Sequence, residues 1–174
     1  NPDYVDLTAN AAFDPALARD LLAQAGYAEG FSTTLKLPPP SYARRGGEII
    51  AAQLREVGIE AEISFLEWAQ WLEQVFRGYD YGLTIVSHTE PMDINIYARP
   101  DYYFQYDNPD FQALIETLAV ESDPAARSAL LAQAQTTIAK DFVNGYLFQL
   151  ALTSVVDAKL KGIWKDAPTQ AVDL

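Results

Sequence analysis

The side chains with the greatest potential for chemistry lie in one short stretch of the sequence. It holds a hydroxyl at Ser87, the only histidine of the chain at His88, and carboxylates at Glu90 and Asp93. A serine, a histidine and an aspartate can form a hydrolytic triad, but residues this close in sequence do not easily reach triad geometry, and the sequence has no Gly-x-Ser-x-Gly turn. A self-contained small α/β hydrolase that uses Ser87, His88 and Asp93 is therefore the alternative hypothesis, and catalysis is not expected.

The carboxylates Glu90 and Asp93 would also suit two other kinds of site. Glycoside hydrolysis needs two carboxyl groups at a controlled separation across the substrate, and a calcium site needs more oxygen ligands at regular spacing. The sequence supplies neither pattern. Because there is no cysteine and only one histidine, thiolate zinc sites, iron–sulfur clusters and multi-histidine metal centres are excluded. No cofactor is expected.

Charge and hydropathy limit the partners of the chain. The 24 acidic and 12 basic side chains give a formal net charge of −12. Such a chain repels phosphate backbones and anionic lipid head groups, so neither nucleic acid nor a membrane surface is expected as a partner. No apolar run approaches the roughly 18 residues that span a bilayer, so direct membrane insertion is not expected. The length of 174 residues predicts a single domain over residues 1–174, because domains usually have roughly 100–200 residues.

Strands and helices alternate through the first half of the chain. These elements must position the side chains of the candidate site. Hydrophobic periodicity and the Gly and Pro punctuation predict helices at about 15–25, 41–56 and 67–77, and strands at about 32–37, 59–66 and 81–86. This order predicts an α/β fold with a parallel sheet and right-handed crossovers. The helix at 41–56 is expected to bury four apolar side chains, Ile49, Ile50, Leu54 and Val57. The alternation in 59–66 is typical of a strand near a sheet edge.

The second half of the chain has a different character. The stretch 87–107 has no sustained period and many aromatic residues, which predicts a long ordered loop. Asn108-Pro109 and Asp123-Pro124 each mark the start of a helix. The segment 145–156 is apolar and β-prone.

Ligands of parallel α/β sheets bind outside the carboxyl ends of the strands. We therefore expect the binding residues in the segments that follow the three predicted strands. Trp71 is expected to pack in the core, and the neighbouring Arg44 and Arg45 to be solvated or paired, since no phosphate-loop pattern surrounds them. The predicted ligand-binding residues are Pro39, Ser41, Tyr42, Trp68, Ser87, His88, Thr89, Glu90 and Asp93.

Several local patterns, in the same order, resemble one protein family. Residues 13–31 resemble the segment YDPxxAxxLLxxAGYxxGF of the family 5 extracellular solute-binding proteins, which are the peptide and nickel receptors of ABC importers. The match covers nearly the whole chain, which makes it more specific than any one motif. Further matching segments are 49–62, Glu67-Trp68, 78–81, 106–114, 123–127 and 161–163.

This resemblance implies a fold, a function and partners. The fold would be a lobe of a type II periplasmic binding protein, three-layered with a mainly parallel central sheet. Family members are several hundred residues long and bind their ligand between two lobes, so this chain would be the C-terminal lobe only, a fragment of a longer protein. The implied function is that of the substrate-binding component of an ABC importer, located in the periplasm or otherwise outside the cytoplasm. Its partners would be a small polar solute such as a peptide, the missing N-terminal lobe and the ABC permease.

Ser87 departs from the family pattern. In peptide-binding members, an aspartate at the matching position contacts the α-amino group of the ligand. A buried amine needs a paired carboxylate because an uncompensated buried charge costs several kcal/mol. Ser87 supplies only a hydroxyl, which weakens the prediction of a peptide ligand. Glu90 or Asp93 could supply the carboxylate instead.

Overall fold

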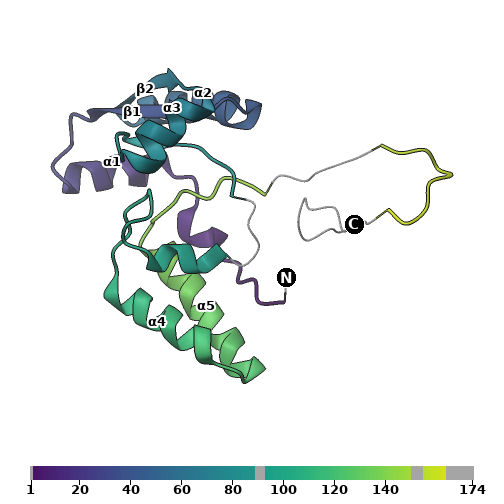
Figure 1. Cartoon of the computed structure of the whole chain (residues 1–174). Coiled ribbons are helices and arrows are strands. Elements are labelled where there is room, and N and C mark those ends of the chain that lie inside the picture. Colours follow the sequence, from purple (N-terminus) through teal and green to yellow (C-terminus); the bar gives the residue numbers. More distant parts are fainter. Residues whose placement is uncertain (1, 89–92, 150–154, 164–174) are drawn as a thin grey trace. The chain divides into compact units, whose positions relative to one another are not determined.

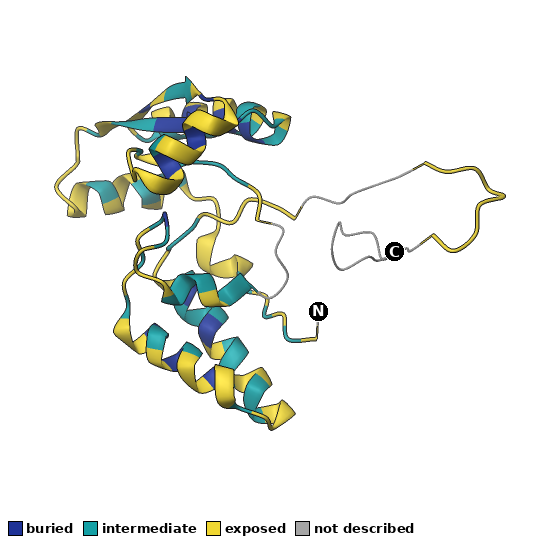
Figure 2. Ribbon diagram, in the orientation of Figure 1, coloured by how far each residue is buried: buried dark blue, intermediate teal, exposed yellow. Residues whose placement is uncertain are grey.

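The computed structural model describes residues 2–88, 93–149 and 155–163, and the chain divides into two compact units (Figure 1). We call Asp6–Ser87 together with Arg99–Asp107 the sheet unit. The helical unit comprises Asn1–Val5, His88–Ala98 and Asn108–Leu174. Figure 2 shows that each unit contains buried residues of its own. The single domain expected over residues 1–174 stays a prediction.

A parallel three-stranded sheet forms the centre of the sheet unit, with the strand order β2-β1-β3. Strand β1 (Phe31–Leu37) pairs with β2 (Ile59–Phe65) along its whole length, from Phe31 opposite Ile59 to Leu37 opposite Phe65. Strand β3 (Leu83–Thr84) pairs with β1 only at Leu83 and Thr84. The α/β fold, the parallel sheet and the edge position of β2 are confirmed, whereas β3 is shorter than the predicted 81–86.

Helix α2 (Ser41–Glu56) covers one face of the sheet through small residues. Ala51 packs there against Leu35, Leu37 and Ala61. A side-chain carbon added at Gly47 would overlap the side chain of Leu37, so the helix lies too close to the sheet for a larger residue.

The close approach of α2 also corrects the face expected from its sequence. Ile49 was predicted to be buried but is 60% exposed, and the fully buried residues of α2 are Ala43, Gly47 and Ala51. Because the small residues make the contact, the larger apolar side chains lie beside it. Ile50, Leu54 and Val57 are accordingly half-buried.

A helix of two parts covers the other face. Helix α3 (Trp68–Trp71) continues directly into the π-helix η2 (Leu72–Arg77), in place of the single α-helix predicted at 67–77. Trp71 and Val75 are buried there with Leu66 and Tyr103. Since successive residues of a strand point to opposite faces, the sheet lies between α2 and the α3–η2 helix. This is the three-layer arrangement expected from the sequence.

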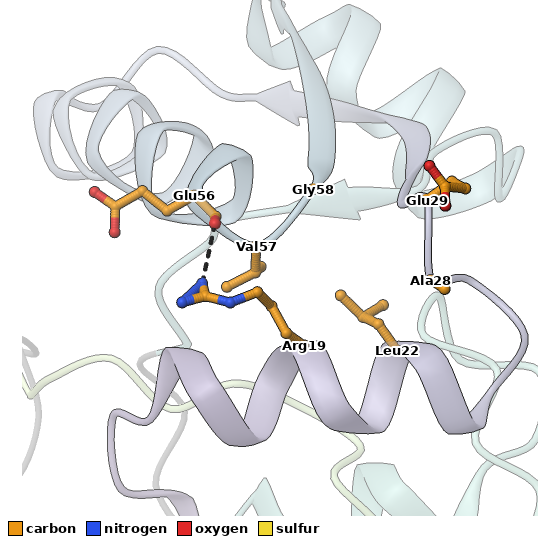
Figure 3. Close-up of a pocket in the computed structure, with 7 residues that line it drawn as sticks. All are labelled: Arg19, Leu22, Ala28, Glu29, Glu56, Val57 and Gly58. Carbon is orange, nitrogen blue, oxygen red and sulfur yellow. Dashed lines mark hydrogen bonds between the residues drawn. The ribbon is translucent and has the colours of Figure 1, made fainter.

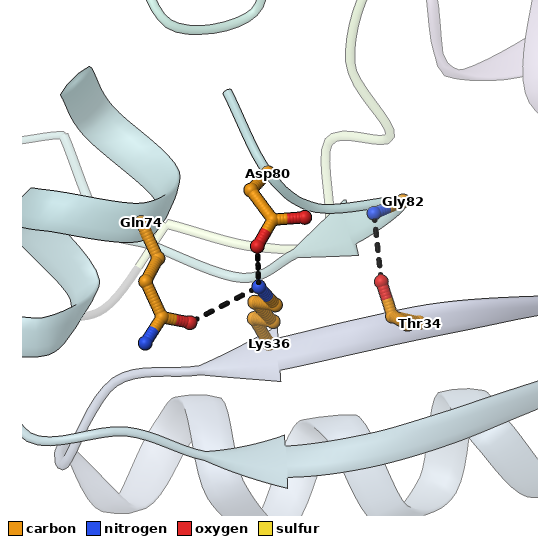
Figure 4. Close-up of polar contacts among 5 residues, drawn as sticks. All are labelled: Thr34, Lys36, Gln74, Asp80 and Gly82. Atoms are coloured by element: carbon orange, nitrogen blue, oxygen red, sulfur yellow. Dashed lines mark hydrogen bonds and ion pairs between the residues drawn. The ribbon is translucent and has the colours of Figure 1, made fainter. Parts of the chain in front are cut away.

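Lys36 is a buried cation on the α3–η2 face of β1. Its Nζ lies 2.8 Å from Oδ2 of Asp80 and donates a hydrogen bond to Oε1 of Gln74 at 3.0 Å (Figure 4). Because a buried ammonium without partners is costly, these contacts allow a lysine in the middle layer. They also connect the turn after η2 to the central strand.

Helix α1 (Pro15–Gln24) begins at the side-chain cap of Asp14 and buries none of its residues in the described structure. It follows the short 3-10 helix η1 (Thr8–Ala11). Nη1 of Arg19 donates a hydrogen bond to the carbonyl oxygen of Glu56 at 3.2 Å. A cavity of about 250 Å³ lies between α1 and the start of β2, at the amino end of the sheet (Figure 3). It is lined by Arg19, Leu22, Ala28, Glu29, Glu56, Val57 and Gly58.

The helical unit contains α4 (Pro109–Val120) and α5 (Pro124–Lys140), which pack against each other. The predicted caps are present, with Oδ1 of Asn108 accepting from the Phe111 amide at 3.1 Å and Oδ2 of Asp123 accepting from the Ala126 amide at 2.8 Å.

Two segments of this half differ from their predictions. The 3-10 helix η3 (Asp93–Ala98) lies within the predicted loop at 87–107. The described parts of the β-prone segment, 145–149 and 155–156, form no strand, and residues 150–154 lie outside the described residues. Among the residues described, no helix is both long and apolar enough to cross a bilayer.

Candidate functional site

The three parallel strands end at one edge of the sheet, which we call the carboxyl edge. Strand β1 leads through a proline-rich turn into α2, β2 leads into α3, and β3 leads to Ser87. Because parallel strands share one direction, the segments that follow them leave from the same edge. Five of the predicted binding residues therefore follow strand ends at the carboxyl edge within the sheet unit, namely Pro39, Ser41, Tyr42, Trp68 and Ser87.

A hydrogen bond between Tyr42 and Ser87 connects the segments that follow two of the strands. The half-buried Tyr42 stands in the first turn of α2, and its hydroxyl oxygen accepts a hydrogen bond from the backbone N–H of Ser87 at 2.9 Å. This contact brings the end of β1 and the end of β3 together. The hydroxyl of Tyr42 thus supports the neighbouring main chain.

Trp68 presents a supported aromatic ring at the same edge. It is 43% exposed, and its ring meets the buried ring of Trp71 edge-on at 5.7 Å between centroids. The first turn of α3 is fixed by a capping box between Glu67 and Gln70. Trp71 packs in the core as predicted and gives the ring of Trp68 a rigid base, whereas the ligand contact expected of Trp68 stays a prediction.

Three further residues at this edge were not predicted as parts of the site. Phe65 ends β2 and is 52% exposed, and the guanidinium carbon of Arg44 lies 5.3 Å from the centre of its ring. Arg44 also contacts Glu67, with 3.3 Å between Nη2 and Oε1, which confirms its expected pairing. The position of Phe65 and Glu67 directly at the end of a predicted strand was the sequence signal that could have identified them.

His88 and Asp93 belong to the helical unit. Nδ1 of His88 lies 3.8 Å from Oδ2 of Asp93, which is within reach of an ion pair but too long for a hydrogen bond. Thr89 and Glu90, which were predicted to bind ligand, lie outside the described residues. The roles predicted for all four residues stay predictions.

A tyrosine pair lies in the neighbourhood of Asp93. The hydroxyls of Tyr97 and Tyr146 are 3.0 Å apart, and Nδ2 of Asn144 donates to the Tyr97 hydroxyl at 2.6 Å. Burial and the negative charge of Asp93 raise the pKa of Tyr97, and desolvation of the hydroxyl, its contact with Tyr97 and the charge of Asp93 raise the pKa of Tyr146, although 67% of that residue is exposed. Both side chains are therefore neutral hydroxyls at neutral pH. No sequence pattern connects Tyr97 with residues almost fifty positions away.

Comparison with known proteins identifies the family to which this chain belongs. Residues 1–104, more than half of the chain, match the family model of bacterial extracellular solute-binding proteins, family 5 Middle. A dipeptide-binding protein of Pseudomonas aeruginosa is 36% identical over 80 residues, which are 43% of this chain and 15% of that protein. The glutathione-binding protein GsiB of Salmonella choleraesuis is 27% identical over 173 residues, which are 87% of this chain and 33% of that protein.

A solved structure shows the same fold. The ABC transporter-associated periplasmic binding protein DppA from Helicobacter pylori, in complex with the peptide STSA, matches with a TM-score of 0.61 and 25% identity. The match covers 72% of this chain and 27% of that chain. This chain thus spans a third or less of the length of these relatives. The family match, together with the parallel sheet and its carboxyl edge, shows that the chain belongs to the family 5 extracellular solute-binding proteins of bacteria.

Proposed function

We propose that this chain is the C-terminal lobe of the substrate-binding component of an ABC importer, outside the cytoplasm or in the periplasm. With an N-terminal lobe of the same polypeptide, it would capture a small polar solute and deliver it to the membrane permease. The observation that carries this proposal is the carboxyl edge, where Tyr42, Trp68 and Ser87 follow the ends of three parallel strands in one unit. The relatives named for dipeptides and glutathione support a short peptide or a similar polar molecule as the solute.

The exposed groups of this edge suit binding without a covalent step. The ring of Trp68 offers an apolar face to a ligand, and the hydroxyl of Ser87 offers both a donor and an acceptor. Affinity in a two-lobe receptor depends on closure of both lobes about the ligand. One lobe alone supplies half of the contacts and is expected to bind weakly.

Thermal unfolding of the complete polypeptide that contains this chain, measured against a panel of dipeptides, tripeptides, glutathione and sugars, tests the proposal. A true solute at 100 times its Kd stabilises the folded state by about 2.7 kcal/mol, which raises Tm by several degrees. The 174-residue chain alone should show no shift at that concentration. Equal affinity for the chain alone would contradict the two-lobe proposal. Hydrolysis of a peptide or ester that is lost in His88→Ala would support the hydrolase instead.

Ser87→Asp tests which end of a ligand the carboxyl edge receives. The new carboxylate would pair with a ligand ammonium, and a hydrogen bond to a charged group contributes about 1.5–3 kcal/mol, or about 10- to 100-fold in affinity. We expect calorimetry on the complete polypeptide to show this gain for peptides with a free amino terminus.

The control variant is Ser87→Asn, and the control ligands are the same peptides after N-acetylation. Neither should show the gain, because each lacks one of the two charges. An equal gain in affinity for acetylated peptides would show that the amino group of the ligand does not lie beside residue 87.

A further inference from the structure

Strand β3 has little backbone pairing to hold it. It pairs with β1 only at Leu83 opposite Leu35 and at Thr84 opposite Lys36, whereas β2 pairs with β1 over its whole length. Ser87 comes three residues after the last of these pairs, and it is also the last residue of the sheet unit before the chain passes to His88. The position of Ser87 therefore depends on contacts other than the β ladder.

On the α3–η2 face, side chains supply contacts for β3. The hydroxyl of Thr84 donates to the carbonyl oxygen of Lys36 at 2.7 Å and accepts from Nε1 of Trp71 at 3.0 Å. Just before the strand, the amide of Gly82 donates to Oγ1 of Thr34 at 2.9 Å (Figure 4). These contacts fix the strand up to Thr84. They do not reach Ser87.

From the opposite layer, α2 supplies the contact at Ser87 itself. Tyr42 is the second residue of α2, and its hydroxyl accepts the Ser87 amide at 2.9 Å. The first turns of this helix are anchored, because Ala43 is buried and Gly47 lies against the side chain of Leu37 in β1. Ile85 and Val86 pack against the two core clusters, but Ser87 after them is exposed, and the Tyr42 hydroxyl is the acceptor for its amide.

We infer that Tyr42 is a positioning residue, which fixes the main chain of Ser87 so that its side chain is preorganised at the carboxyl edge for the solute. This inference rests on the proposed function, and it gives Tyr42 a role through Ser87 rather than through direct contact with the ligand. A ligand that binds a preformed site does not have to order it, so loss of the contact should weaken binding without unfolding the unit.

The first test is amide hydrogen exchange on the 174-residue chain without ligand. Tyr42→Phe removes one oxygen atom and should speed exchange at Ser87 by about 5- to 10-fold, the contribution of one hydrogen bond of ordinary strength. The Leu66 amide, which donates to the Leu37 carbonyl at 2.9 Å at the same edge, is the internal reference and should not change. Unchanged exchange at Ser87 would overturn the inference.

The second test is solute affinity of the complete polypeptide. Tyr42→Phe should raise Kd about 5- to 10-fold and leave Tm nearly unchanged. The matched control is Tyr79→Phe, which also removes one hydroxyl of the sheet unit. That hydroxyl donates to the Asp101 carbonyl at 2.7 Å, and its loss should leave Kd unchanged. Faster Ser87 exchange with an unchanged Kd would overturn the positioning role. Failure of the unaltered protein to bind any solute would instead contradict the proposed function. The exchange experiment tests the Tyr42 contact independently, because it needs no solute.

Discussion

Gly30→Ala is expected to lower the free energy of unfolding by about 3–5 kcal/mol, among the largest effects of any single substitution in this chain. A side-chain carbon at Gly30 would overlap the backbone carbonyl of Gly58. The two backbones cannot separate easily, because the Phe31 amide donates to that same carbonyl at 3.2 Å where β1 and β2 begin to pair. Urea unfolding followed by circular dichroism measures the loss.

Gly26→Ala separates the two causes of this loss. Both glycines have a positive φ, +75° at Gly30 and +88° at Gly26, but a side-chain carbon at Gly26 meets no atom within 4 Å. Gly26→Ala therefore carries only the penalty of the left-handed conformation, about 1–2 kcal/mol. If both variants lost the same stability, the close approach of the strands would not be the reason.

Trp71→Ala should destabilise the sheet unit by about 3–5 kcal/mol, the usual cost of removing a buried tryptophan side chain. Only 4% of Trp71 is exposed, and its ring contacts those of Trp68, Phe76 and Tyr103. The substitution would leave a cavity between the sheet and the α3–η2 helix, and it would remove the donor to Thr84. The measurement is again the free energy of unfolding in urea.

Trp68→Ala is the matched control, three residues earlier on the same helix. Because Trp68 is 43% exposed, its removal should cost less than about 1 kcal/mol of stability. It should instead weaken solute binding by the complete polypeptide, if the ring contacts the ligand as proposed. Equal destabilisation by the two substitutions would show that Trp68 is part of the core.

The sequence predicted elements well where local signals mark both ends. Asp14, Asn108 and Asp123 cap helices in the structure as expected, and α2 spans the predicted residues. In the sheet unit, two elements differ from their predictions because their form depends on neighbours. Apolar spacing could not indicate that the helix after β2 changes into a π-helix at Leu72, since a segment of 6 residues is too short to show the wider π-helical period. The β-prone run at 81–86 could not show that side chains replace most of the ladder of β3.

The candidate site was predicted in part for the same reason. Strand ends can be placed from sequence, and parallel strands bring their ends to one edge, so Tyr42, Trp68 and Ser87 could be named together. The direction in which each side chain points could not be predicted from the sequence. The ligand contact expected of Tyr42 stays a prediction, but the hydrogen bond from the Ser87 amide to its hydroxyl could not be predicted, because it depends on how closely α2 packs on the sheet.

The sequence by itself determined the alternation of strands and helices, the parallel sheet, the carboxyl edge and the resemblance to solute-binding proteins. These properties follow from periodicity, caps and turn residues, which act between neighbours in the chain. Only the tertiary structure decided that Gly47 rather than Ile49 faces the sheet and that Lys36 has Asp80 as its partner. It also brought Tyr97 to Tyr146. Such contacts join residues far apart in sequence, and their geometry exists only once the layers have packed.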